Sequence, residues 1–316
     1  MNEVFELPDN LFSENPTNAA QNSVELARFM RLYQRIKLRP KPMPIAAPVF
    51  LDRRGTELIA PLGFEFRGTV PRCAVVVRAE NCTLERVRNV GMPGQTRPLQ
   101  AIAYDSGFVF EPAARNTRAI GCESANQANG GFLNFGSQHL FMDMCKSIDT
   151  GADGVHHTFG AGWAEVNRHV CIRTGDDFYS TVSHANEAMT HHILVRNSEG
   201  YDQRWGRGAT VIGGEHIKYE GLRLYRCSGF GVNINSEDSY NTHGVNHVEL
   251  SDITIDGTGV GQPTPIDWVG VLVGGRAAGW VRNVSTKNII VRNSVGPTKR
   301  HVAAFTQNID LSGVND

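Results

Sequence analysis

The sequence lacks the features that would direct it to a membrane or to nucleic acid. No stretch approaches about 18 consecutive apolar residues, and the start, MNEVFELPDN, carries acids where a signal peptide needs a basic end and an apolar run. Lysine and arginine number 31 against 32 aspartates and glutamates, so the formal net charge of −1 creates no field that attracts nucleic acid or anionic lipid. These absences predict a soluble protein that is cytoplasmic or associated with a virion.

Cysteine pairs with metal or redox spacing are also lacking. The six cysteines show neither C-x-x-C spacing nor the density of a disulfide scaffold. We therefore expect reduced, mostly buried thiols at Cys73, Cys82, Cys122, Cys145, Cys171 and Cys227. His184, His191 and His192 have no reliable metal spacing. No metal or other cofactor is expected, except calcium if the protein were a lyase, because aspartate clusters bind calcium.

Glycine, in contrast, is abundant, at 33 of 316 residues, against a usual share of about 7 %. Some of these glycines mark the starts of a repeat of short β-type runs, which are spaced 24, 23, 24, 30, 23 and 39 residues apart. The runs start at Gly107, Gly131, Gly154, Phe178, Gly208, Gly231 and Gly270. A second series lies between them and starts at His139, His169, Ile193, Leu222, Val248 and Ile289.

This repeat predicts an all-β fold. A unit of about 23 residues is too short for helical repeats of roughly 33 to 47 residues, and its runs alternate with a period of two. Each unit is therefore interpreted as one coil of a parallel β-solenoid whose coils pair about 4.8 Å apart. Equivalent positions then form ladders, so Cys122, Cys145 and Cys171 are expected to stack. The two long spacings predict loops on the binding side, within residues 183–205 and 236–268.

Residues 1–48 lack the repeat and are expected to be an extension with a capping helix, followed by the solenoid domain at 49–316. Asn22 followed by Glu25 is typical of a helix start, and an apolar stripe follows at Leu26, Phe29, Met30, Tyr33 and Ile36. Such a helix would cover the open sheet edge at the end of the solenoid. The six basic residues between positions 28 and 41 are more typical of a solvated face than of a membrane or nucleic-acid contact, so neither partner is expected.

Aligning the runs brings three aspartates to one corner of two neighbouring coils. Asp153 precedes the run at Gly154, Asp176 and Asp177 precede the run at Phe178, and Arg207 precedes the next one. Carboxylates about 5 Å apart cannot all ionise freely, so one holds a proton near neutrality while another stays charged. Glycosidic cleavage needs this division between an acid and a base or nucleophile. Gly-Asp-Asp could alternatively form a turn that has no function. The alignment of Asp153 and Arg207 with this segment on neighbouring coils favours a functional site.

Three segments carry a family resemblance: Gly151-Ala-Asp-Gly-Val-His, Gly175-Asp-Asp-Phe and Trp205-Gly-Arg-Gly-Ala-Thr-Val-Ile-Gly-Gly. Together they resemble the motif set of the polygalacturonase branch of right-handed parallel β-helix proteins, the pectin-lyase-like superfamily. The resemblance implies cleavage of a polysaccharide in a groove along the parallel sheet. It also implies that Asp176 is the general acid and that Asp153 and Asp177 activate water, with inversion. The family has Asn-Thr at Gly151-Ala152, histidine at Arg207 and a later Arg-Ile-Lys that is missing here, so galacturonan is not the expected substrate.

Further side chains near these motifs are candidates for contacts with the glycan. His156 is expected to face the groove, and Arg207 either pairs with Asp177 or binds an anionic sugar group. The aromatic candidates offer faces on which sugar rings stack; they are Trp163, Tyr201, Trp205, Tyr240 and Trp268.

The leading hypothesis is a glycoside hydrolase that acts on a polysaccharide or oligosaccharide. One alternative is a polysaccharide lyase or a fructan-cleaving transferase on the same fold. The other is a non-catalytic, glycan-binding component of a phage tailspike, for which a homotrimer is expected by resemblance.

Overall fold

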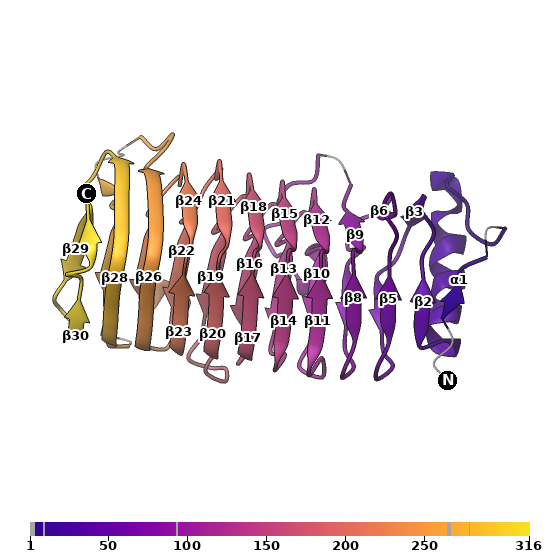
Figure 1. Ribbon diagram of the computed structural model, residues 1–316, viewed down its shortest axis with the longest axis horizontal. Helices are drawn as coiled ribbons and strands as arrows, with labels where there is room; N and C mark the ends of the chain where they lie inside the picture. Colours follow the sequence, from indigo (N-terminus) through magenta and orange to yellow (C-terminus); the bar gives the residue numbers. More distant parts are fainter. Residues whose placement is uncertain (1–3, 9, 93, 264–266, 278) are drawn as a thin grey trace.

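Short parallel strands stacked in register make up most of the computed structural model, which describes residues 4–8, 10–92, 94–263, 267–277 and 279–316 (Figure 1). The chain winds into coils whose strands form three faces, and the long axis runs from the N-terminal helix to the C-terminal strands. This is the all-β, right-handed parallel β-helix that the repeat and the resemblance predicted.

One face is a ten-stranded parallel sheet, and its strands are the first series of runs in the sequence. The strands are β4 (Val49–Leu51), β7 (Val75–Val77), β10 (Phe108–Phe110), β13 (Phe132–Phe135), β16 (Val155–Thr158), β19 (Tyr179–Val182), β22 (Ala209–Ile212), β25 (Val232–Asn235), β27 (Val271–Gly274) and β29 (Lys299–Val302). The register pairs Val155 with Tyr179 and Tyr179 with Ala209, as the sequence alignment of the runs requires.

The second series of runs is not one row of strands, as the sequence suggested. Its members belong to two different faces of the solenoid. The β2–β23 face contains β2 (Arg35–Lys37), β5 (Glu57–Ile59), β8 (Thr83–Glu85), β11 (Thr117–Ile120), β14 (Leu140–Asp143), β17 (Gly162–Asn167), β20 (His191–Arg196) and β23 (Gly214–Glu220). The β3–β24 face contains β3 (Pro42–Ile45), β6 (Glu65–Gly68), β9 (Arg88–Val90), β12 (Glu123–Ala125), β15 (Lys146–Ile148), β18 (Val170–Ile172), β21 (Glu199–Tyr201) and β24 (Arg223–Tyr225).

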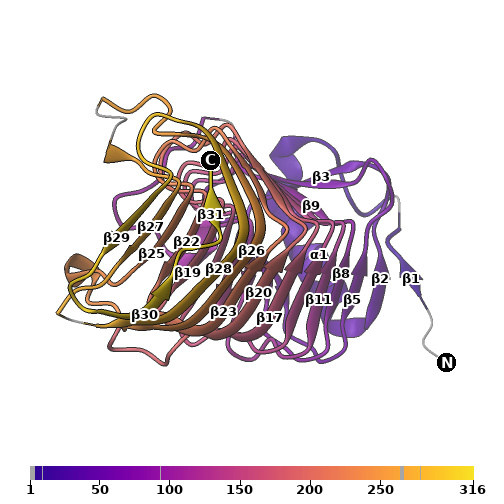
Figure 2. The same cartoon turned by 60° about the vertical axis from the view of Figure 1, so that its left-hand side comes forward.

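Two long strands, β26 (Val245–Thr258) and β28 (Val281–Ser294), continue both of these faces and join them into one sheet (Figure 2). The β28 strand pairs with β30 (Thr306–Asp310) and β31 (Val314–Asn315), and β1 (Phe5–Glu6) pairs with β2. Three short 3-10 turns complete the described elements: η1 (Pro16–Asn18), η2 (Ala103–Asp105) and η3 (Asp238–Tyr240).

The glycines at the run starts have a packing role. A Cβ on Gly131 would lie 2.3 Å from Ser147 Oγ, and one on Gly154 would lie 2.3 Å from Cys171 Sγ. The glycine before β13 and the glycine before β16 therefore each leave room for a side chain from the β3–β24 face. Where Phe178 replaces the glycine, the opposing residue becomes Gly200, whose Cβ would lie 2.2 Å from the Phe178 ring.

Helix α1 (Ala19–Leu32) packs on β3 and β4 at the N-terminal end of the coils. Leu26, Phe29 and Met30 are buried, as the apolar stripe predicted. The helix starts three residues before the predicted Asn22, which is instead buried and donates to Pro44 O at 2.9 Å. The solenoid also begins before residue 49, because β2 and β3 already pair with β5 and β6.

All six cysteines are buried and free, as predicted. The expected three-residue ladder is wrong in part. Glu123 pairs with Lys146, so Cys122 and Cys145 are neighbours, whereas Cys171 pairs with Ser147. The longer spacing of 26 residues moves Cys171 two positions along the coil. Among the described residues, no helix has the length and apolar character needed to span a membrane.

Candidate active site

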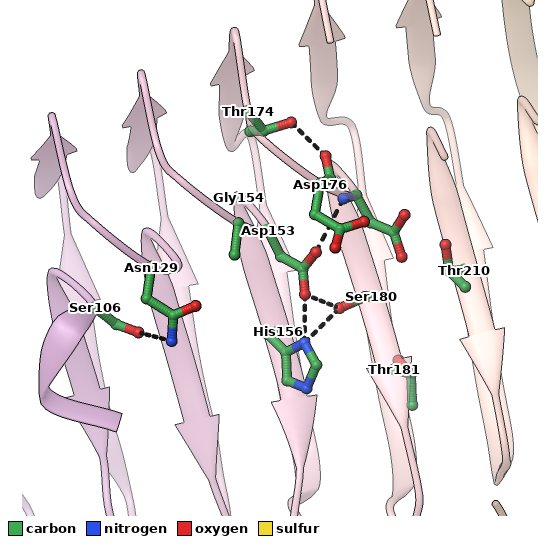
Figure 3. Close-up of polar contacts among 12 residues, drawn as sticks. Ser106, Asn129, Asp153, Gly154, His156, Thr174, Asp176, Ser180, Thr181 and Thr210 are labelled. Carbon is green, nitrogen blue, oxygen red and sulfur yellow. Dashed lines mark hydrogen bonds and ion pairs between the residues drawn. The ribbon is translucent and has the colours of Figure 1, made fainter. Parts of the chain in front are cut away.

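The three aspartates lie together at the corner that precedes β16 and β19, where the alignment of the runs placed them. One carboxylate oxygen from each of Asp153, Asp176 and Asp177 lies within 4.8 Å of the others. Figure 3 shows Asp153 and Asp176 at this corner, with Ser180 and His156 beside Asp153. Parallel pairing of β16 with β19 creates this cluster, because it sets Asp153 beside Asp177 on adjacent coils. Side chains that are 23 and 24 residues apart in sequence thereby become neighbours.

Asp153 is held by a dense set of hydrogen bonds. Its Oδ1 accepts from the backbone N–H of Asp177 at 2.9 Å, and its Oδ2 accepts from Ser180 Oγ at 2.9 Å. His156 Nδ1 contacts the same Oδ2 and lies 2.8 Å from Ser180 Oγ. His156 lines the cavity beside the cluster and His157 is buried in the core, as strand alternation predicts.

Asp177 is the most buried of the three carboxylates, with only 3 % of the residue exposed. Its Oδ1 accepts from the backbone N–H of Arg207 at 2.7 Å, and its Oδ2 accepts from Arg207 Nη2 at 3.1 Å. The structure thus selects the ion pair for Arg207, one of the two alternatives open from the sequence. The pair fixes Asp177 at the back of the site.

Asp176 is the carboxylate with the most access to solvent, and its side chain is 15 % exposed. Its Oδ2 accepts from Arg97 Nη1 at 2.8 Å. On the opposite side lies Gly206, which has φ of +97° and on which a Cβ would lie 2.6 Å from Asp176 Oδ1. Only glycine therefore fits beside this carboxyl without moving it.

Burial and mutual repulsion separate the protonation behaviour of the three groups. Burial, followed by the charges of Asp177 and Asp153, raises the pKa of Asp176 to about 8, against the opposing effects of Arg207 and Arg97. Burial also raises the pKa of Asp177, against the charge of Arg207. Burial acts in the same direction on Asp153, but the hydrogen bond and charge of His156 outweigh it and lower the pKa of that carboxyl. The cluster therefore combines a carboxyl that keeps its proton near neutrality with a carboxylate that stays charged.

The cluster opens into a cavity of about 220 Å³. Trp205 and Tyr240, both exposed candidates from the sequence, line it, and both come from the predicted insertions. Glu237 and His184 also line it. A second cavity of about 310 Å³ adjoins it, shares Trp205, Arg207 and Glu237 with it, and is lined by Trp268.

Two of the aromatic candidates do not line these cavities, which corrects the sequence expectation. Trp163 lies on β17 of the β2–β23 face, where its ring stacks on His192 at 3.8 Å. Tyr201 lies on β21 of the β3–β24 face and stacks on Tyr225 at 5.0 Å. Both residues therefore lie on strands of the other two faces, which the sequence could not tell apart.

Arg97, Ser180 and Glu237 are site residues that the sequence analysis did not identify. Ser180 could have been found, because it is the second residue of the β19 run and alternation places it on the same side as His156. Arg97 lies in the segment between β9 and η2, 79 residues from its partner Asp176 and outside the repeat. No periodicity signal connects those two positions.

The aspartate cluster has the oxygen atoms for a cation, since each side chain offers one ligand atom. Two of the three carboxylates, however, already pair with guanidinium groups, Asp176 with Arg97 and Asp177 with Arg207. Positive charge at this distance disfavours a further cation. The donor set therefore suits proton transfer better than calcium binding.

Solved structures share this architecture, although no protein-family model and no curated protein match the chain. The catalytic domain of a GH87 α-1,3-glucanase in complex with nigerose superposes with a TM-score of 0.78 at 16 % identity, covering 97 % of this chain and 57 % of that chain. A polygalacturonase from Erwinia carotovora ssp. carotovora has a TM-score of 0.60 at 13 % identity, with 93 % of both chains covered. A family 28 exopolygalacturonase from Yersinia enterocolitica has a TM-score of 0.64 at 10 % identity, covering 98 % of this chain and 78 % of that chain.

These similarities establish the right-handed parallel β-helix fold. The chain spans somewhat less than three fifths of the glucanase it matches. Variants of the GH87 glucanase, each in complex with a sugar, replace single aspartates at three positions, of which the second lies 23 residues after the first and the third directly follows the second.

Proposed function

We propose that this protein is a glycoside hydrolase that cleaves a polysaccharide or oligosaccharide in the groove on the ten-stranded sheet. The observation that carries the proposal is the pairing, within 4.8 Å, of a carboxyl whose pKa is about 8 with a carboxylate whose pKa is lowered. Glycosidic hydrolysis uses such a pair of an acid and a base or nucleophile.

In the proposed reaction, Asp176 donates its proton to the glycosidic oxygen as the bond from that oxygen to the anomeric carbon breaks. The bonding electron pair leaves with the oxygen. Asp153, assisted by Asp177, holds a water molecule that attacks the anomeric carbon, and Asp153 accepts the proton that this water loses. Proton exchange with solvent then returns Asp176 to its acid form and Asp153 to its carboxylate form. Asp176 suits the acid role because it is the most exposed of the three carboxyls and favours its proton.

Two further observations support this assignment. The spacing of Asp153, Asp176 and Asp177 is the same as that of the three aspartates replaced in the glucanase variants. The cavity beside them is lined by Trp205 and Tyr240, aromatic side chains of the kind that stack on sugar rings.

The test replaces each aspartate with asparagine, which keeps its shape and removes its acid–base function. Wild-type protein is incubated with a panel of neutral and acidic polysaccharides, and the products are measured as new reducing ends and by mass spectrometry. On any glycan that is cleaved, Asp153→Asn, Asp176→Asn and Asp177→Asn are each expected to lower kcat by roughly 100- to 10,000-fold. Asp202→Asn is the matched control, since Asp202 pairs with Arg226 on the surface and does not line the cavity.

The same assay distinguishes the alternatives. A lyase releases an unsaturated product that absorbs in the ultraviolet, and a transferase joins the released sugar to an acceptor other than water. A tailspike-type binding protein retains the glycan without changing its mass. Any of these outcomes, or unchanged turnover in all three asparagine variants, contradicts the proposal.

A further inference from the structure

The second cavity lies beside the aspartates, toward the C-terminal end of the groove. It has a volume of about 310 Å³ and is lined by residues from β25 and from the segments before and after β27. Trp205, Arg207 and Glu237 form the wall that it shares with the cavity of the aspartates. A ligand that occupies both cavities therefore extends along the axis of the solenoid.

Three residues of this cavity carry buried polar atoms without a hydrogen-bond partner among the described residues, Arg207 Nε, Asn233 Oδ1 and Trp268 Nε1. Arg207 Nε lies 3.1 Å from Asp177 Oδ1 in an ion pair, which leaves Asn233 Oδ1 and Trp268 Nε1. Asn233 is only 3 % exposed. Leaving a buried donor or acceptor unpaired costs about 1–3 kcal/mol, so these atoms favour a ligand that supplies partners.

The unpaired atoms need opposite partners, because the amide oxygen of Asn233 only accepts and the indole N–H of Trp268 only donates. A sugar hydroxyl both donates and accepts, whereas a carboxylate placed against the amide oxygen of Asn233 could not donate to it. Of the three charged residues that line the cavity, Arg207 is already paired with Asp177, and Glu237 and Arg276 have opposite signs, so the cavity does not select an anion.

The cavity also offers an apolar platform. The Trp268 ring packs edge-on against Phe230 with ring centroids 4.7 Å apart, and Trp205 is 55 % exposed at the boundary with the aspartates. Flat aromatic surface with polar groups at its edge matches a pyranose ring, which has an apolar face and a rim of hydroxyls.

From these observations we propose that the second cavity is a subsite for one uncharged sugar unit of the glycan, with Asn233 and Trp268 as its hydrogen-bonding residues. This inference rests on the proposed function, since it places the subsite next to the bond that is cleaved. It goes further by naming a neutral glycan as the substrate class.

The experiment measures binding separately from cleavage. The indole N–H signal of Trp268 is assigned in nitrogen-15 spectra by its loss in Trp268→Phe, and the protein is titrated with nigerose, maltose, cellobiose, laminaribiose and digalacturonate. At least one neutral disaccharide is expected to shift the Trp268 signal, and digalacturonate is not. Asn233→Leu is expected to weaken binding of that disaccharide about tenfold, the loss of about one hydrogen bond.

Asn246→Leu serves as the matched control, because Asn246 lies on β26 and bonds Asn283 away from the groove. Thermal melting confirms that each variant is folded. Absence of a Trp268 shift with every neutral disaccharide, a shift with digalacturonate alone, or equal affinity in Asn233→Leu and wild type overturns the subsite. A disaccharide that binds at Trp268 while no glycan is cleaved contradicts the hydrolase and leaves the subsite standing.

Discussion

Arg97 and Asp176 share a hydrogen bond that is one of several influences on how this site responds to pH. Burial and two neighbouring carboxylates raise the pKa of Asp176, while Arg207 and Arg97 act in the opposite direction, and the result is about 8. An acid catalyst works only while it holds its proton. If Asp176 is the acid, kcat/KM is therefore expected to fall above about pH 8, whereas the lowered pKa of Asp153 keeps the base charged on the acidic side.

Removing Arg97 tests that assignment. Arg97→Ala takes away a group that lowers the pKa of Asp176, so the alkaline limb of the kcat/KM profile is expected to move upward by roughly one pH unit. Arg97→Lys keeps the positive charge and is expected to leave the limb nearer its wild-type position. An alkaline limb that stays in place in Arg97→Ala shows that a group other than Asp176 supplies the proton.

At the scale of the strands, the exchange between Phe178 and Gly200 shows how adjacent faces share space. Several coils pair a glycine before the ten-stranded sheet with a side chain from the β3–β24 face, as Gly154 pairs with Cys171. Phe178→Gly alone removes a buried ring and is expected to cost about 3–5 kcal/mol. Gly200→Cys alone is expected to destabilise the protein as well, because a Cβ there would lie 2.2 Å from the Phe178 ring.

The double variant Phe178→Gly/Gly200→Cys recreates the pairing of Gly154 with Cys171. It is expected to be more stable than Phe178→Gly. Its loss of unfolding free energy is expected to be far smaller than the sum of the losses in the two single variants. Denaturant unfolding of the four proteins measures this coupling. Additive losses would mean that the two faces pack independently at this coil.

The same strands explain what the sequence could and could not predict. The repeat fixes where β16, β19 and β22 begin. The alignment of these runs therefore placed Asp153, Asp177 and Arg207 on adjacent coils. Arg97 could not be predicted, because a non-repeating segment carries it to a partner 79 residues away. Trp163 and Tyr201 were misplaced because two faces with similar apolar strands merged into one series.

At the scale of the whole molecule, the coils combine a packed interior with a polar groove, and polar groups also lie inside. His157 and His169 are 1 % and 0 % exposed. Asn134 Nδ2 lies 3.2 Å from His157 Nδ1, and Ser147 Oγ lies 3.0 Å from His169 Nε2. Burial, followed by the charge of a neighbouring histidine, lowers the pKa of each imidazole to about 3. Both rings are therefore neutral in the folded protein.

These two histidines predict how stability changes on acidification. In the unfolded chain a histidine takes up a proton near pH 6.5, whereas these two stay neutral in the folded state down to about 3. The two histidines therefore leave the free energy of unfolding unchanged above about pH 6.5. Below that pH, each of them lowers it by about 1.4 kcal/mol per pH unit. Carboxylates with a lowered pKa, such as Asp143 and Asp149, lose their contribution only below about pH 4. Between about pH 7 and about pH 5, denaturant unfolding is expected to show that wild type loses roughly 4 kcal/mol more than His157→Gln/His169→Gln, because the raised pKa of Asp176 affects both proteins equally. Equal losses in the two proteins would place the acid sensitivity elsewhere in the solenoid.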